Sequence, residues 1–312
     1  MIPAYRGLKE VPADFGPCIA AIGNFDGVHR GHQQILRAVV QEARERGTKA
    51  VAITFEPHPE HFLRPGSAPC LLTPMDQRIP LLAACGIDAV VILLFDETLA
   101  RLSAAQFVEW VLGDALGIAG LHEGGNFRFG YKAEAGVREL AAFGAEFGFT
   151  LVLHQAVHVH GLEVSSSAIR QLISAGDMRR ARWMLGRPFS IVGTPKRDRG
   201  VGSRLLVPTM NLSAYPGLLP ANGVYITRLR VGGRYFHAVT NVGNRPTFSD
   251  AGFSVESHIL NFEPVESDET TPLELEFLKR LREERRFDST ESLKAQIMND
   301  IARASRFFRL AR

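Results

Sequence analysis

Apolar residues in the first half of the chain gather in short runs that alternate with segments of helical periodicity. Continuous apolar runs at Cys18–Ile22, Ala50–Phe55 and Ala89–Phe95 are typical of strands buried on both faces of a parallel sheet. Leu151–Val157 has the composition of a further strand. These runs predict the strands of one α/β domain.

Helices are expected between the strands. Gly31–Arg46 carries its apolar residues on one helical face, and in Pro74–Cys85 a hydroxyl cap, Thr73, precedes a proline at the first helical position. Ser103–Gly113 and Ala133–Phe147 are further helical candidates. Strands that alternate with helices predict right-handed crossovers and a Rossmann-like sheet.

The pattern changes near Gly186-Arg187-Pro188, so we expect two domains, 1–185 and 186–312. Many short strand-like runs separated by turn residues predict a small antiparallel β-barrel in the second domain. The expected strands are Phe189–Val192, Leu205–Leu212, Val224–Val231, Tyr235–Val242, Phe253–Leu260 and Leu273–Leu281. A closing helix follows, capped by Asp288 or Ser289, with an apolar stripe of Leu293, Ile297, Ile301 and Phe308 that we expect to pack on the barrel.

Composition narrows the class of protein. With 46% hydrophobic and 22% charged residues the chain is an ordinary globular protein, and its 312 residues suffice for two domains. A net charge of +3 is too small to argue for nucleic acid or a membrane surface as partner, and we expect neither. Three cysteines without metal-ligand spacing and the lack of a signal or spanning segment predict a cytoplasmic protein, which we expect to be a monomer or a transient homo-oligomer.

A ten-residue segment, G-N-F-D-G-V-H-R-G-H at positions 23–32, follows the first buried strand and opens a helix. A helix N-terminus at the carboxyl end of a strand is a natural site for phosphate groups, and Gly23, Gly27 and Gly31 allow close backbone approach. His29 and His32 are three residues apart and can face one phosphate chain. This arrangement suits attack on the α-phosphorus of a nucleoside triphosphate, where charge must be neutralised without a covalent intermediate. Two nearby histidines could also be core or surface residues, although the complete segment favours a nucleotidyltransferase. The P-loop and dinucleotide-binding fingerprints do not occur in the sequence.

Three further segments support this site. T-F-E-P-H-P contains His58 at the end of the second strand, and G-G-N-F-R-F-G presents Asn126 between aromatic residues; either could also be an ordinary loop. S-S-S-A-I-R starts a helix, where one serine serves as the cap and Ser166 and Arg170 could bind phosphate oxygens.

Taken in order, G-N-F-D-G-V-H-R-G-H, T-F-E-P-H-P, N-F-R-F-G and S-S-x-x-I-R resemble the adenylyltransferase module of bacterial bifunctional riboflavin kinase/FAD synthetases. The resemblance extends over nearly the whole chain. It implies that His29 and His32 are catalytic and contact ATP phosphates, while His58 and Asn126, together with Asp26, lie at the flavin. The residues it implies for ATP or phosphate binding in this module are Gly23, Asn24, Phe25, Gly27, Gly31, Ser166 and Arg170.

The second domain resembles the riboflavin kinase module of the same family. P-T-M-N contains Thr209, a hydroxyl ligand for Mg²⁺, and Asn211, which would hold the metal or a phosphate. In V-E-S-H, Glu256 would accept the proton of the riboflavin 5′-hydroxyl, although a strand glutamate is more often simply solvated. Lys196, Gly200 and Gly202 are the candidates for covering the phosphates.

Two segments depart from the family pattern. The glycine- and arginine-rich flap before P-T-x-N is altered at 196–206, where Ser203 stands in place of an arginine and Leu206 in place of a glycine. An acidic segment at 263–269 replaces the usual acidic-aromatic loop. These changes bear on the affinity of the kinase domain for nucleotide.

The resemblance therefore implies an enzyme that phosphorylates riboflavin to FMN and then adenylylates FMN to FAD and pyrophosphate. ATP would be the co-substrate of both steps, and Mg²⁺ would neutralise phosphate charge. Three alternatives remain at this point: an adenylyltransferase with a decayed kinase domain, an H-x-G-H transferase with another acceptor, and a flavin-nucleotide-binding regulator without catalysis.

Overall fold

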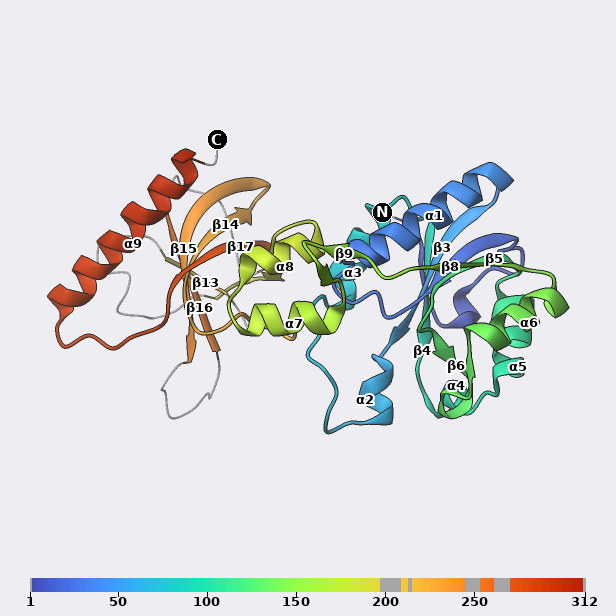
Figure 1. Cartoon of the computed structure of the whole chain (residues 1–312). Coiled ribbons are helices and arrows are strands. Elements are labelled where there is room, and N and C mark those ends of the chain that lie inside the picture. Colours follow the sequence, from blue (N-terminus) through green and yellow to red (C-terminus); the bar gives the residue numbers. More distant parts are fainter. Residues whose placement is uncertain (1, 197–208, 213–214, 245–252, 261–269, 311–312) are drawn as a thin grey trace. The chain divides into compact units, whose positions relative to one another are not determined.

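The computed structural model describes residues 2–196, 209–212, 215–244, 253–260 and 270–310 (Figure 1). Contacts divide the chain into two compact units, Met1–Ser166 and Ser167–Arg312, and each is described by itself. The boundary at 185/186 falls at the end of helix α8 (Met178–Leu185) and stays a prediction about the functional modules.

The first unit is built on a six-stranded parallel sheet of order β1-β4-β3-β2-β5-β8. Its strands are β1 (Ala4–Arg6), β2 (Cys18–Ile22), β3 (Lys49–Glu56), β4 (Ala89–Leu94), β5 (Ile118–Gly124) and β8 (Thr150–His154). The predicted parallel sheet and four of these strands are confirmed. The sequence reading missed β1 and β5. β5 lies next to β2 but interrupts its apolar character with two glycines, His122 and Glu123.

Helices cover both faces of this sheet. Successive residues of β2 point to opposite sides, so Ile19 and Ala21 pack beneath α1 (Arg30–Arg46) and α3 (Met75–Ala83). Ala20 and Ile22 pack on the other side against a π-helical segment at Phe107–Ala115 and against α6 (Val137–Phe147). The remaining elements are 3-10 turns at Leu8–Glu10 and Tyr131–Ala133, α2 (Pro59–Leu63), α4 (Glu97–Ala100), α5 (Ala104–Gln106), and the short strands β6 (Arg128–Phe129), β7 (Ala135–Gly136), β9 (His158–Val159) and β10 (Leu162–Glu163).

The predicted cap of the second helix is wrong. α3 begins at Met75 with Pro74 as its N-cap residue and without a side-chain cap bond. The Thr73 hydroxyl instead accepts the backbone N–H of Gly27, 46 residues away in sequence and 2.9 Å away in space. The local sequence, a hydroxyl residue before a proline, fits both a helix cap and a bond to a distant loop. The contact with Gly27 decides for the second role.

The second unit contains a curled seven-stranded sheet of order β11-β17-β14-β15-β16-β13-β12, in which all neighbours are antiparallel. Its strands are β11 (Phe189–Gly193), β12 (Pro195–Lys196), β13 (Thr209–Leu212), β14 (Gly223–Val231), β15 (Arg234–Asn244), β16 (Phe253–Ile259) and β17 (Leu273–Arg282), and its helices are α7 (Ser166–Ser174), α8 and α9 (Thr290–Leu310). The predicted barrel-like antiparallel domain with a closing helix is confirmed.

The closing helix α9 is capped by Ser289, whose hydroxyl oxygen accepts the N–H of Ser292 at 3.1 Å. Of its predicted stripe, Ile301 and Phe308 pack against the sheet. Leu293 and Ile297 remain 37% and 39% exposed. No described helix combines the length and apolar character needed to cross a bilayer.

An ion pair attaches α9 to the sheet. The Nε of Arg282 on β17 donates to the Asp300 carboxylate at 2.9 Å, and Gln296 donates to the second Asp300 oxygen at 2.9 Å. Two acidic residues, Glu283 and Glu284, lie closer to Arg282 in the sequence. Asp300 is the partner because it lies on the buried face of the helix, with only 2% of the residue exposed.

We predict that Asp300→Ala destabilises the second unit by about 2–3 kcal/mol, because it leaves the Arg282 charge without this partner in a largely buried position. Chemical unfolding monitored by circular dichroism measures the change. Asp288→Ala, at an exposed position just before the same helix, is the matched control. Equal stabilities for the two variants would contradict the prediction.

Candidate functional sites

The loop between β2 and α1 has an unusual backbone. Phe25 and Val28 adopt positive φ angles of 45° and 38°, and Gly27 between them has a φ of 84°. Residues other than glycine adopt this region at a cost, and such residues cluster at binding sites. The side chains of Phe25 and Val28 are both buried, so packing holds the loop in this form.

The two histidines of the segment lie at the start of α1. His29 is the N-cap residue, and its Nδ1 accepts the N–H of His32 at 3.3 Å. The two rings stack with their centroids 3.6 Å apart, and the edge of Phe25 meets His32. A Cβ on Gly31 would lie 3.2 Å from the His29 ring, so this glycine makes room for the stack.

Two polar atoms of this loop are buried and have no hydrogen-bond partner among the described residues. They are Asn24 Oδ1 and His32 Nδ1. Burial lowers the pKa of the His32 imidazole well below its usual range, and the charges of His29 and Arg78 lower it further. Buried polar atoms normally find partners, so these two mark a place where a ligand can supply them.

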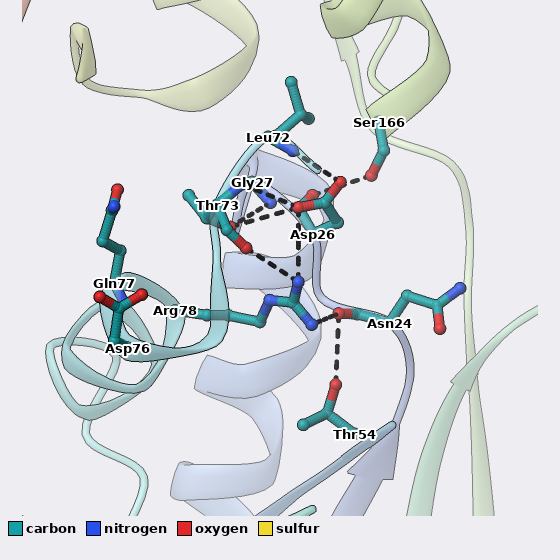
Figure 2. A network of polar contacts seen from close by, with 10 residues as sticks. All are labelled: Asn24, Asp26, Gly27, Thr54, Leu72, Thr73, Asp76, Gln77, Arg78 and Ser166. Carbon is teal, nitrogen blue, oxygen red and sulfur yellow. Dashed lines mark hydrogen bonds and ion pairs between the residues drawn. The ribbon is translucent and has the colours of Figure 1, made fainter. Parts of the chain in front are cut away.

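Asp26 has polar partners within the protein. It is fully buried, its carboxylate accepts the N–H groups of Leu72 and Thr73 at 3.0 and 2.9 Å, and Arg78 lies 3.6 Å away (Figure 2). These bonds give the Asp26 carboxylate a structural role, and the flavin contact expected for Asp26 stays a prediction. Its side chain joins the loop to the segment that precedes α3.

The backbone of the same loop is held by other side chains. Arg78 and Thr54 both donate to the carbonyl of Asn24, at 2.9 and 3.2 Å, and Ser166 donates to the carbonyl of Asp26 at 2.9 Å (Figure 2). Thr54 and Arg78 are buried and were missed by the sequence reading. An arginine within an amphipathic helix is expected on the surface, and the residues around Arg78 in the sequence do not indicate that its side chain points inward.

The other residues expected at this site lie on several elements. His58 is the N-cap residue of α2 at the end of β3, and its ring accepts the N–H of Glu60 at 3.2 Å. Asn126 is exposed in the turn between β5 and β6. Ser166 and Arg170 are four residues apart on α7. The structure thus brings Ser166 to the loop through its bond to Asp26.

Glu123 is a buried carboxyl group that the sequence reading missed. Glu123 is the penultimate residue of β5. Its Oε1 accepts the N–H of Ile22, the residue that precedes Gly23, at 2.7 Å. Burial raises its pKa well above the usual value of 4.5. The Glu123 side chain therefore fixes the end of β2, and burial favours its uncharged form.

In the second unit, strand register lines up three polar residues. Asn211 on β13 is opposite Glu256 on β16, and Glu256 is opposite Asn241 on β15. Residues directly opposite one another share a face of the sheet. Glu256 accepts a hydrogen bond from Ser254 at 3.0 Å, and Asn211 Oδ1 is buried without a partner among the described residues. Asn241 was not singled out as a site residue because only the register places it there.

The neighbouring residues of β16 follow the same alternation. His258, two residues after Glu256, is opposite Thr209, and burial lowers the pKa of its imidazole. Ser257 points to the other face, where its hydroxyl joins those of Thr240 and Thr227 in a buried chain with spacings of 2.9 and 2.7 Å. One face of β16 therefore carries the candidate site residues Glu256 and His258, and the other face packs in the core.

A cavity of about 380 Å³ opens beside this row, between the sheet and α9. Glu256, Asn241 and His258 line one side of it. The rest of its wall is formed by Val224, Val239, Arg282, Glu284, Arg285, Phe287, Leu293, Ile297, Asp300 and Ile301. The partial exposure of Leu293 and Ile297 is explained by this cavity, because both side chains form part of its wall.

The residues expected to cover the phosphates of the second site differ in how far the structure describes them. Lys196 lies on β12, where its backbone pairs with Asn211. Gly200 and Gly202, the altered flap at 197–206 and the acidic segment at 263–269 lie outside the described residues.

Comparison with known proteins finds a family model for each part of the chain. The FAD synthetase family model matches residues 11–168, and the riboflavin kinase family model matches residues 185–308. A bifunctional riboflavin kinase/FMN adenylyltransferase from Pseudomonas fluorescens is 37% identical over 300 residues, which cover 96% of both chains. The chain belongs to the bifunctional riboflavin kinase/FMN adenylyltransferase family.

Another relative and one solved structure extend the comparison. The enzyme of the same name from Escherichia coli (strain K12) is 33% identical, and the match covers 100% of this chain and 99% of the relative. A solved structure described as a macrolide-efflux protein from Streptococcus pneumoniae is 24% identical and covers 96% of this chain and 97% of its own, with a TM-score of 0.85. At that identity, the likeness bears on the fold alone. The family resemblance read from the sequence is confirmed.

We predict that Glu123→Gln becomes increasingly stabilising relative to the parent chain as pH rises above 4.5. Above pH 4.5 the unfolded parent chain releases the Glu123 proton that the folded chain keeps. The free energy of unfolding of the parent chain therefore falls as pH rises. Glutamine keeps an acceptor for the Ile22 N–H and does not ionise. Urea unfolding between pH 5 and pH 8 tests this.

The control is Glu139→Gln. The exposed Glu139 accepts the Gly136 N–H at the start of α6, which lowers its pKa, so this substitution is expected to cost stability at neutral pH. Parallel pH profiles for Glu123→Gln and the parent chain would contradict the prediction.

Proposed function

We propose that the chain carries out two successive ATP-dependent transfers, each at one of the two sites. At the second site, riboflavin and ATP give FMN and ADP. At the first site, FMN and a second ATP give FAD and pyrophosphate. The observation that best supports the residue roles is that each site contains at least one buried polar atom with no hydrogen-bond partner among the described residues, next to groups suited to phosphate chemistry.

At the second site we assign Glu256 as the general base. It lies on the wall of the cavity, which is within the usual size range of small-molecule sites and is apolar along α9. We propose that the flat ring system of riboflavin lies against Leu293 and Ile297, with its ribityl chain directed to Glu256. The Glu256 carboxylate then accepts the proton of the terminal hydroxyl as that oxygen attacks the γ-phosphorus of ATP.

Mg²⁺ fits the same row of residues. Asn211 Oδ1 is buried, lacks a described partner and lies beside Glu256 in the register, and an amide oxygen is a suitable ligand for a hard cation. We propose that Asn211, with Thr209 two residues earlier on the strand, holds the ion, and that Lys196, Gly200 and Gly202 cover the phosphates. When bound, the ion neutralises charge on the transferring phosphoryl group.

At the first site we propose that His29 and His32 contact the phosphates of ATP. They lie where the α1 N-terminus offers N–H groups and a partial positive charge, which suits the developing charge on the α-phosphorus. We propose that Asn24, with its buried Oδ1, and the loop residues Gly23, Phe25, Gly27 and Gly31 bind ATP or its phosphates beside the two histidines.

We further propose that Ser166 and Arg170 bind the triphosphate and that His58 and Asn126 contact the flavin. Asp26 is assigned to support of the loop, since its carboxylate is turned to Thr73 and Arg78. We also propose that the enzyme works in the cytoplasm as a monomer or transient homo-oligomer, without nucleic acid or membrane as partner.

We predict that Glu256→Gln lowers the rate of FMN formation from riboflavin by about a hundredfold or more, because glutamine cannot accept the proton. The conversion of added FMN to FAD should stay unchanged in the same preparation. Chromatography of riboflavin, FMN and FAD over one time course with ATP and Mg²⁺ measures both. Glu274→Gln, at a strand glutamate on β17 that pairs with Arg230, is the control. Unaltered FMN formation in Glu256→Gln would remove Glu256 as the base.

We predict the reverse pattern for His32→Gln. FAD formation from FMN should fall by about a hundredfold, since the substitution breaks the ring stack and removes an imidazole from the phosphate site. Riboflavin phosphorylation by the same molecules serves as the internal control. A variant that still makes FAD at the parent rate would contradict the assignment.

A further inference from the structure

A group of three buried polar residues holds the loop of the first site, and two of the three lie outside the resembled motifs. It consists of Thr73 and Arg78, from the segment that leads into α3, and Asp26, from the loop itself (Figure 2). Their exposed fractions are 5%, 2% and 0%, so none of them faces solvent. We call this group the loop clamp.

Thr73 is the centre of the loop clamp. Its hydroxyl accepts the N–H of Gly27 at 2.9 Å and donates to the Asp26 carboxylate at 3.3 Å. Its backbone N–H donates to the same carboxylate at 2.9 Å, and its carbonyl accepts from Arg78 at 2.8 Å. One residue thus contacts the loop, the buried acid and the buried base.

Arg78 extends this hold to the other end of the loop. Its guanidinium donates to the carbonyl of Asn24 at 2.9 Å, where Thr54 also donates. The loop clamp therefore fixes the backbone at both Asn24 and Gly27. Phe25 lies between these points, and its ring meets His32 at 5.2 Å between centroids.

The residues between the two fixed points need such a hold. Phe25 has a φ of 45°, a conformation that costs about 1 kcal/mol or more for a residue with a side chain. Asn24 and His32 each bury a polar atom without a partner among the described residues. A loop that bears these costs persists only where surrounding bonds determine it, and here the loop clamp supplies those bonds.

We propose that Thr73 and Arg78 are positioning residues for adenylyl transfer: they hold Asn24 and the His29–His32 pair in the geometry that receives the ATP phosphates. The inference rests on the proposed function of the first site. The loop clamp does not touch substrate. It acts by keeping the loop in its strained form, so that little rearrangement is needed when the nucleotide binds.

The test is the pair Thr73→Val and Thr73→Ser. Valine has the shape of threonine but lacks the hydroxyl, so it removes the acceptor of the Gly27 N–H and leaves the backbone contacts of residue 73 in place. Serine keeps the hydroxyl. Displacement of a site by about an ångström can cost about a hundredfold in rate. Thr73→Val should therefore lower kcat for FAD formation by about that factor, with the KM for FMN within about threefold, while Thr73→Ser restores most of the rate.

Three internal checks separate positioning from folding. Riboflavin phosphorylation by the same molecules should remain at the parent rate in every variant. The loss of FAD formation in Thr73→Val should be constant over temperatures well below the melting transition; a loss confined to the approach of melting would overturn the proposal. Arg78→Lys, which keeps the charge but cannot reach both carbonyls with a forked guanidinium, should give the same loss, and Arg101→Lys, at an arginine whose side chain is 72% exposed, should give none.

The remaining outcomes are equally decisive. Parent-like FAD formation in folded Thr73→Val overturns the role of the hydroxyl, and a Thr73→Ser variant as impaired as Thr73→Val does the same. If the parent chain itself converts riboflavin to FMN but not FMN to FAD, the proposed function of the first site fails, and with it the reason for a loop clamp. That result is distinct from a parent chain that makes FAD and a valine variant that also does.

Discussion

A buried charge pair sets the conditions for the first unit. Asp26 and Arg78 lie 3.6 Å apart with almost no exposure, and removing two such charges from water costs several kcal/mol each unless hydrogen bonds complete their coordination. The completing groups are the N–H groups of Leu72 and Thr73 and the carbonyls of Asn24 and Thr73. The cost of burial is therefore met by backbone groups of the two segments that must be brought together. The parallel sheet brings the ends of β2 and β3 to one edge, and this pair fixes the loop that starts there.

The second unit positions its polar residues by a different means. Its chemistry depends on register: antiparallel pairing of β13, β16 and β15 places Asn211, Glu256 and Asn241 in one row. The Arg282–Asp300 pair holds α9 across from that row, and the cavity lies between them. The first unit holds a loop in place, whereas the second unit places α9 opposite a row of side chains on the sheet. Both arrangements leave a polar atom buried and ready for a ligand.

The sequence predicted the parts that local patterns determine. The apolar runs of β2, β3 and β4, the helix α1 and the glycine-rich segment at its start were recognised because each has a periodicity or motif within a few residues. β5 was missed because His122 and Glu123 interrupt its apolar run, and their burial is explained only by neighbours on other strands and on α1. Thr73 was predicted to cap α3, and the buried partners of Asp26 were not predicted, because neither residue has a local sign of its tertiary partner. Asn241 and His258 become visible only through strand register, which no single strand contains.

The alternation along β16 has a consequence for how this chain can change over generations. Glu256 faces the cavity, while Ser257 faces the core and joins the hydroxyl chain. Inserting or deleting one residue in this strand would exchange the two faces, bury a carboxylate in the core and turn a hydroxyl toward the cavity. Side chains in the core can drift by substitution, but the length of the strand cannot. Variation in length is therefore confined to the connections between strands.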